Sequence, residues 1–252
     1  MRWRILVFAS AFTIATFTAG HGAHGQTYLL PQDPAAPVIT LDYRGDRLKR
    51  IDEAPTLSIL ASGSVIMPQS YAHTRAYEGQ ISEAELQGLL DFIIRENRFF
   101  DYNSEAVDAK LSRLWRQPLP AHLSTTVISV NADNQTKEIR CHALGHGPQV
   151  EETERLLAIK HRLNRLMSTV KLGGSAEVAK WVEIANQNLG LKSLKSLDAA
   201  PLTAEDLEGV GQAGDGSSYI RFVRRDVAKT TMVTIDVTAD GENHVTVAQG
   251  DL

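Results

Sequence analysis

The chain has 252 residues, of which 43% are hydrophobic and 22% charged, and its formal net charge is −4. This composition is typical of a folded globular protein with one large domain or two small ones, and it argues against a disordered chain. A mildly acidic protein lacks the basic field that non-specific nucleic-acid binding needs. The single cysteine, Cys141, excludes an intramolecular disulfide and a four-cysteine zinc site.

Residues 1–25 have the layout of a secretory signal peptide. Two arginines near the start are followed by an uncharged apolar run over 5–17, which is shorter than a membrane-spanning helix, and Ala23-His24-Gly25 fits a cleavage site before Gln26. The alternative is an uncleaved anchor, because short anchors share these features. We therefore expect export to the periplasm or outside the cell, with cleavage before Gln26 and no membrane span in the remaining chain.

The segments that follow predict an antiparallel sheet. Residues 26–37 hold three prolines and indicate an extended lead-in. Alternating apolar residues then predict strands over 38–43 and 57–61, a hairpin partner around 65–67, and a further strand over 73–78.

The strongest local pattern lies between residues 79 and 100. Ser82 and Glu85 have the spacing of a capping box, in which each side chain binds the other residue's backbone N–H, and Ile81 with Leu86 fits the hydrophobic staple. Apolar residues then recur at helical spacing, at Leu86, Leu89, Leu90, Ile93 and Ile94. The pattern predicts an amphipathic helix that covers one face of the sheet.

Three more segments complete a first domain that we expect to span 38–170. Residues 101–122 form an excursion with a helix that ends before two prolines. A hairpin turns at Asp133-Asn134, and a helix over 150–170 begins with acids and continues with bases, the order that complements the helix dipole. The resulting fold class is α+β: a two-layer antiparallel sheet with helices on one face.

The tail over 175–252 has its own, smaller α+β pattern. It predicts a helix from Ser175 that stops at Gly190, and three strands over 219–225, 232–238 and 244–248. The G-x-G-x-x-G at 209–214 lacks the strand before it and the helix after it that a nucleotide site needs, so we interpret it as a flexible linker. Arginines at 221, 224 and 225 are interpreted as charge protection of an edge strand.

The stretch from Val38 to Ser168 resembles an uncharacterised family of exported bacterial domains. The resemblance rests on PVITLDYRG, LSILASGSVIM, EGQISEAELQGLLDFIIRENRFFDY and STTVISVNADNQTKEIRCHALG, followed by the helix EETERLLAIKHRLNRL. It covers about half of the chain, and its motifs describe architecture. The resemblance implies an exported α+β domain, and it implies no activity and no catalytic residue.

Cys141, His142 and His146 are the closest group of soft metal ligands in the sequence. Neighbouring residues on a strand point to opposite faces, so we expect Cys141 to face the core and His142 to face outward. His142 and His146 remain a pair that could chelate a metal with a distant third ligand, His73 or His161. This pair defines the alternative function, an exported metal-dependent hydrolase.

The first hypothesis is instead an exported, non-catalytic binding or envelope-associated protein without a cofactor. Its partner would be an unidentified protein or envelope component, and the sequence does not fix the oligomeric state. Trp115, flanked by Arg113 and Arg116, is the candidate partner surface, because Trp and Arg are favoured at interface hot spots. The competing interpretation is that Trp115 covers the end of the sheet.

Overall fold

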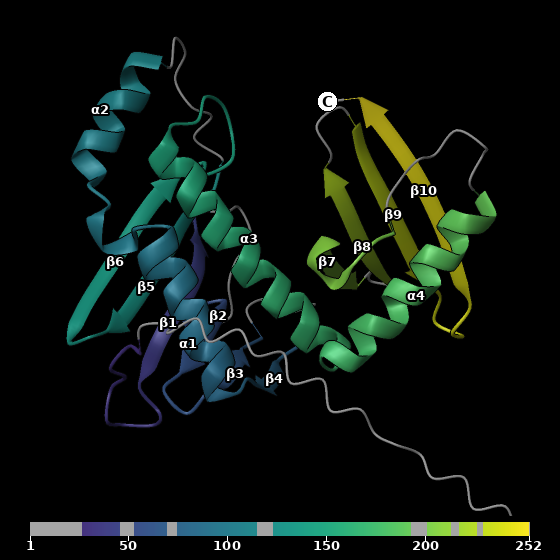
Figure 1. Ribbon diagram of the computed structural model, residues 1–252, viewed down its shortest axis with the longest axis horizontal. Coiled ribbons are helices and arrows are strands. Elements are labelled where there is room, and N and C mark those ends of the chain that lie inside the picture. The colour runs from purple at the N-terminus through teal and green to yellow at the C-terminus, as the bar shows by residue number, and fades with distance from the viewer. Residues whose placement is uncertain are drawn as a thin grey trace, which may run out of the picture.

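The computed structural model describes residues 27–45, 53–69, 75–114, 123–192, 201–212, 217–225 and 229–251 (Figure 1). It contains two antiparallel sheets, and helices pack against each of them. The α+β class predicted from the sequence is therefore confirmed. We call residues 27–172 the first unit and residues 175–251 the second unit.

The first sheet has the strand order β4-β3-β2-β1-β5-β6, and every neighbouring pair is antiparallel. Its strands are β1 (Pro37–Arg44), β2 (Leu57–Leu60), β3 (Ser64–Met67), β4 (Tyr77–Gln80), β5 (Thr125–Ala132) and β6 (Gln135–His142). The strand predicted over 73–78 is displaced, because pairing with β3 sets β4 from Tyr77 to Gln80. Asp133 and Asn134 both have positive φ, as a two-residue hairpin turn requires.

Helices cover one face of this sheet (Figure 1). They are α1 (Glu83–Asp91), its π-helical continuation η1 (Phe92–Glu96), the 3₁₀ turn η2 (Phe99–Asp101) and α3 (Glu151–Leu172), whereas α2 (Ser104–Leu114) is tied to α3 by the ion pair between Lys110 and Glu152. The predicted capping box is confirmed: Ser82 Oγ accepts from the Glu85 N–H at 3.2 Å, and the Glu85 carboxylate accepts from the Ser82 N–H at 2.8 Å.

The core of the first unit lies between this sheet and the helices. Leu86, Leu90 and Ile93 from the helical layer are almost completely buried, and they belong to the same cluster as the inward-facing strand residues Ile39, Leu41, Ile59, Val130 and Ile139. The apolar stripe predicted for the helix after residue 79 is therefore on the correct face. Burial of each such side chain stabilises the fold by about 1.5–3 kcal/mol.

The second unit has a separate core. Helix α4 (Ser175–Lys192) packs on a sheet of order β10-β9-β8-β7, and Val178, Ala185, Phe222 and Ile235 are buried between them. The other elements are η3 (Ala204–Asp206), β7 (Leu207–Gln212), β8 (Ser218–Arg225), β9 (Lys229–Val237) and β10 (Asn243–Asp251).

Three predictions about this unit are wrong. Residues 209–214 were interpreted as a linker, but Leu207–Gln212 forms strand β7, so the sheet has four strands instead of three. Strand β8 consequently lies between β7 and β9, so its arginines do not protect an edge. Helix α4 continues through Gly190 to Lys192, because packing on the sheet outweighs the weak helix propensity of one glycine.

Helix α3 joins the two units. It ends at Gly173, whose φ of 96° is the left-handed conformation that terminates a helix, and the chain turns there into α4. The outer side of α3 lies against β7, so the same helix contributes to the first core and to the contact with the second unit. Among the described helices, none combines the length and the apolar character that crossing a bilayer requires.

Candidate functional site: the cleft between the two units

The candidate partner surface is described only at one residue. Arg113 lies exposed in the last turn of α2, whereas Trp115 and Arg116 lie outside the described residues. The surface therefore stays a prediction.

Cys141 and His142 lie on opposite faces of strand β6, as the alternation of side chains along a strand predicts. Cys141 is buried with Ile139 on the core face of β6, and His142 is exposed on the other face. His146 is exposed in the turn that follows, near Gly145 and Gly147. In the described part of the chain, no group of three His, Cys, Asp or Glu side chains is placed to hold a metal ion. A zinc site at His142 and His146 would need a further ligand from elsewhere, and the hydrolase alternative stays untested.

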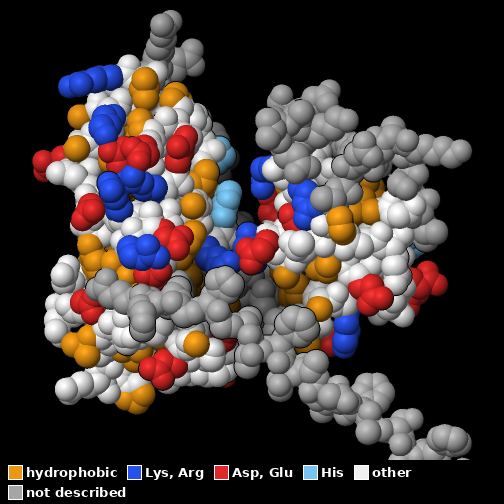
Figure 2. Space-filling view, viewed as in Figure 1, with side chains coloured by type: hydrophobic (Ala, Val, Ile, Leu, Met, Phe, Trp, Pro, Cys, Tyr) orange, Lys and Arg blue, Asp and Glu red, His pale blue; other side chains and the backbone are white. Residues whose placement is uncertain are grey.

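The structure draws attention to a different place, a hollow between α3 and the edge of the second sheet. It has a volume of about 240 Å³ and is lined by Lys160, His161, Asn164, Arg165, Glu205, Asp206, Leu207, Glu208, Val223 and Arg225. Figure 2 shows basic, acidic and histidine side chains gathered where the two units meet. We call this space the charged hollow.

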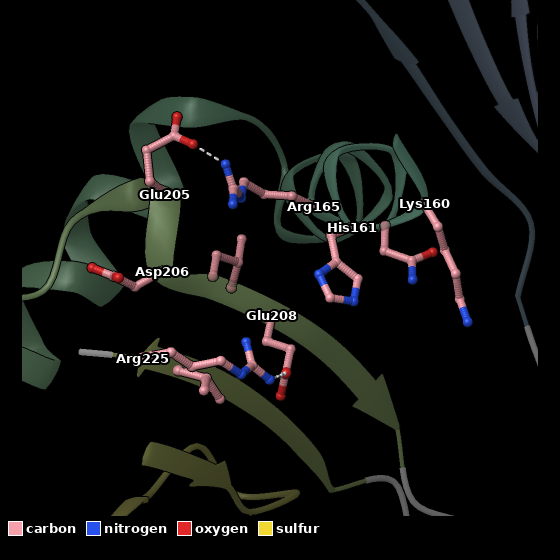
Figure 3. Close-up of a pocket in the computed structure, with 10 residues that line it drawn as sticks. Lys160, His161, Arg165, Glu205, Asp206, Glu208 and Arg225 are labelled. Atoms are coloured by element: carbon pink, nitrogen blue, oxygen red, sulfur yellow. Dashed lines mark hydrogen bonds and ion pairs between the residues drawn. The ribbon is translucent and has the colours of Figure 1, made fainter. Parts of the chain in front are cut away.

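One wall of the charged hollow is the outer side of α3. Lys160, His161 and Asn164 follow the helical period on the side away from the core residues Ile159 and Leu163. Figure 3 shows Lys160 and His161 projecting from the same side of the helix.

The first sheet supports this wall through Tyr43. The Tyr43 hydroxyl donates to Asn164 Oδ1 at 2.8 Å, and the Lys160 ammonium lies 5.6 Å from the centre of the Tyr43 ring. Burial raises the pKa of Tyr43 to about 12, so the hydroxyl keeps its proton. Because Asn164 Oδ1 is occupied, its amide N–H groups are the part of this side chain available to a ligand.

The opposite wall carries three acids, and an arginine pairs with each. Glu205 accepts from Arg162 at 3.1 Å and also from Arg165, which links η3 to α3. Asp206 pairs with Arg224 of β8 in a largely buried contact. The Glu208 carboxylate accepts from Arg225 at 2.7 Å, and Figure 3 shows this pair across the hollow from His161.

The electrostatic result is an excess of hydrogen-bond donors on the α3 wall. Desolvation lowers the pKa of His161, and Arg225 and Lys160 lower it further; Glu208 opposes them, and Arg165 adds the smallest lowering effect. Desolvation also lowers the pKa of Lys160. Within the described residues, neither side chain forms an ion pair with an acid, although the Lys160 ammonium is 3.4 Å from the Leu144 carbonyl oxygen.

The donors of this hollow suit the binding of an anionic group. A carboxylate, phosphate or sulfate group would meet Lys160, His161 and the Asn164 amide on one side and Arg225 on the other.

From the sequence, His161 stands out only as a distant metal ligand and Arg225 only as part of an expected edge strand. The helical period predicts a polar stripe on the 150–170 helix. It does not predict which residues that stripe contacts, because Arg162 and its partner Glu205 are 43 residues apart in the chain.

No protein-family model, curated protein or solved structure matches the chain. The resemblance to a family of exported bacterial domains stays a prediction, and the function rests on the site itself.

Proposed function

We propose that the protein is an exported, non-catalytic binding protein that holds an anionic group of its ligand in the charged hollow. The ligand would belong to an envelope component or to a partner protein. The single observation that carries this proposal is the pairing pattern: each described acid of the hollow is engaged by an arginine, and Lys160, His161 and the Asn164 amide have no acid partner.

A cation held in a partly desolvated place without an acid is unfavourable in the free protein, as the lowered pKa of Lys160 reflects. A bound anion supplies the missing charge, and its hydrogen bonds to charged donors are stronger than bonds between neutral groups. The attachment of Asn164 and Lys160 to Tyr43 holds these donors in place before a ligand arrives, which lowers the entropic cost of binding.

Sulfate tests the site directly by isothermal titration at constant ionic strength. We expect sulfate to bind, and Lys160→Met to weaken the binding about tenfold or more, because one charge-assisted contact is lost. Lys180→Met is the matched control: Lys180 is exposed on α4 and pairs with Glu177, so the same substitution there should leave sulfate affinity unchanged. Absence of sulfate binding, or equal affinity in Lys160→Met and wild type, would contradict the proposal.

The pH dependence of sulfate binding gives a second, independent prediction. His161 attracts an anion when protonated, and its pKa is lowered in the free protein, so it is largely neutral at neutral pH. Sulfate affinity should therefore rise as the pH falls through the pKa of His161, and the bound anion should raise that pKa in turn. Sulfate keeps its charge over the range of about pH 5 to 8 in which histidine titrates, so the change reports on the protein.

His161→Gln identifies the group responsible. Glutamine keeps a hydrogen-bond donor but does not titrate, so the affinity of this variant should be nearly independent of pH. A pH profile that persists in His161→Gln would assign the titration to another residue.

Export is tested separately. We expect the mature protein to begin at Gln26, because the charged start, the short apolar run and Ala23-His24-Gly25 have the order of a signal peptide. N-terminal sequencing of protein made in a secreting host measures this. Protein that starts at Met1 and stays in the cytosol would contradict the export part of the proposal while leaving anion binding intact.

A further inference from the structure

A second and larger hollow lies farther along α3, where the ends of both units meet. It has a volume of about 540 Å³, within the range of small-molecule sites, and its walls come from β4, the end of α3, α4 and the β7–β8 hairpin. We call it the aromatic hollow, and its lining includes Arg75, Tyr77, Lys171, Trp181, Gly211 and Tyr219.

The charges of the aromatic hollow all have one sign. Arg75 and Lys171 line it, and none of the described lining residues is an acid, although the chain as a whole carries a net charge of −4. Neither cation forms a hydrogen bond or ion pair with a described residue. Desolvation lowers the pKa of Lys171, because an ammonium group held away from water without an anion is less stable in its charged form.

The aromatic residues present both apolar surface and polar tips. Tyr77, Trp181 and Tyr219 line the hollow from β4, α4 and β8. None of their hydroxyl or indole N–H groups is hydrogen-bonded to a described residue. Such side chains commonly bind rings, because their flat faces offer contact area and their tips offer hydrogen bonds.

The Tyr219 ring packs closely over the neighbouring strand. The ring crosses this strand at Gly211, and a Cβ atom at residue 211 would lie only 2.3 Å from Tyr219 Cε1. The Arg221 guanidinium lies 5.4 Å from the centre of the same ring. Tyr219 nevertheless keeps 38% of its surface exposed. Gly211, which the sequence places in an expected linker, thus makes room for the Tyr219 ring.

We propose that the aromatic hollow is a second binding site, and that its ligand is a small carboxylate attached to a ring, with the ring on Tyr219 and Trp181 and the carboxylate at Lys171 and Arg75. The ring is either aromatic or that of an acidic sugar. This site is separate from the charged hollow and does not depend on the function proposed above.

Isothermal titration with benzoate and with glucuronate tests the proposal and distinguishes the two sources of the ring. Benzyl alcohol supplies a ring without the charge, and acetate supplies the charge without a ring. We expect at least one of the two ring carboxylates to bind about tenfold or more tightly than acetate and benzyl alcohol. Only a ligand with both a ring and a carboxylate contacts the aromatic residues and the two cations together.

Lys171→Met separates a binding role from a structural one. This variant should weaken the binding of the ring carboxylate about tenfold or more while its melting temperature stays equal or rises, because methionine fills similar space without a desolvated charge. Lys171→Arg should bind nearly as the wild type does, because it keeps the charge. Lys180→Met on the exposed side of α4 is the matched control and should bind normally.

Two results would overturn the proposal. One is that neither benzoate nor glucuronate binds at millimolar concentration. The other is that Lys171→Met binds the ring carboxylate as tightly as the wild type, which would place the ligand elsewhere. Lys160→Met should leave the tighter, ring-dependent binding of benzoate or glucuronate unchanged and should affect only the weaker carboxylate binding that acetate shares at the charged hollow. This result keeps the two hollows distinct.

Discussion

Leu90→Ala is expected to lower the free energy of unfolding of the first unit by about 2–5 kcal/mol. Leu90 has no exposed surface and packs in the cluster between α1 and the six-stranded sheet. Its truncation removes the transfer free energy of the buried atoms and leaves a cavity that the tightly packed neighbours fill only in part. Urea unfolding followed by far-ultraviolet circular dichroism measures the loss.

Ser82→Ala on the same helix is the matched comparison. It removes the Oγ acceptor that binds the Glu85 N–H, and the expected loss is only about 0.5–2 kcal/mol, because the helix stays packed and water can reach the freed N–H group. If Ser82→Ala destabilised the protein more than Leu90→Ala, the burial assigned to this helix face would be incorrect.

These two residues also show which parts of the fold were predictable. The capping box needs only residues three positions apart, and the apolar stripe needs only the helical period, so both could be recognised without tertiary information. The same holds for the Asp133-Asn134 hairpin, whose turn residues tolerate positive φ.

Strand β7 shows why other parts were not predictable. Gly209 and Gly211 are poor strand residues by local propensity, and the sequence alone favours a linker. The strand forms because β8 pairs along it and Tyr219 packs over Gly211, which supplies the side-chain contact that the glycine lacks. Local signals could not reveal this, because the compensating residue is on another strand.

The end of α1 depends on a similar compensation. The helix widens into a π-helical turn at Phe92–Glu96, and the backbone N–H and the side-chain amide of Asn97 both bind the Phe92 carbonyl oxygen, the latter at 2.8 Å. The apolar period runs through this segment without interruption, so the pattern predicted a regular helix where the backbone changes form.

The candidate sites were even less accessible to sequence reasoning than the fold. Both hollows lie between units that are separate in the sequence, and their lining residues converge only because α3 packs against β7. A sequence reveals functional groups whose members are neighbours in the chain, such as those around His142 and Trp115, but it does not show which distant residues meet. Lys160 and Lys171 are marked by the residues that surround them in the fold, which the sequence around each lysine does not reveal.

The thiol of Cys141 is expected to react about 100-fold more slowly with iodoacetamide at pH 8 in the folded protein than in the unfolded chain. Burial raises the pKa of this thiol to about 11, with a further contribution from Asp108, against opposing contributions from Tyr102 and Lys160. Only the thiolate is nucleophilic. At a pH below the pKa, a rise of one in the pKa lowers the fraction of thiolate about tenfold. Cys141 is only 8% exposed, so iodoacetamide reaches its thiol less easily and the reaction slows further.

The measurement compares alkylation rates in buffer and in urea by mass spectrometry, with the urea-unfolded chain as the control because it carries the same single cysteine. In the folded protein, the thiolate fraction of Cys141 should keep rising with pH up to its raised pKa. In the unfolded chain the fraction levels off above about pH 9, so the difference between the two rates should shrink above that pH. A folded protein that reacts as fast as the unfolded chain at pH 8 would mean that Cys141 does not face the core. It would also restore Cys141 as a thiolate ligand beside His142, and with it the metal-dependent alternative, because zinc binds the deprotonated form.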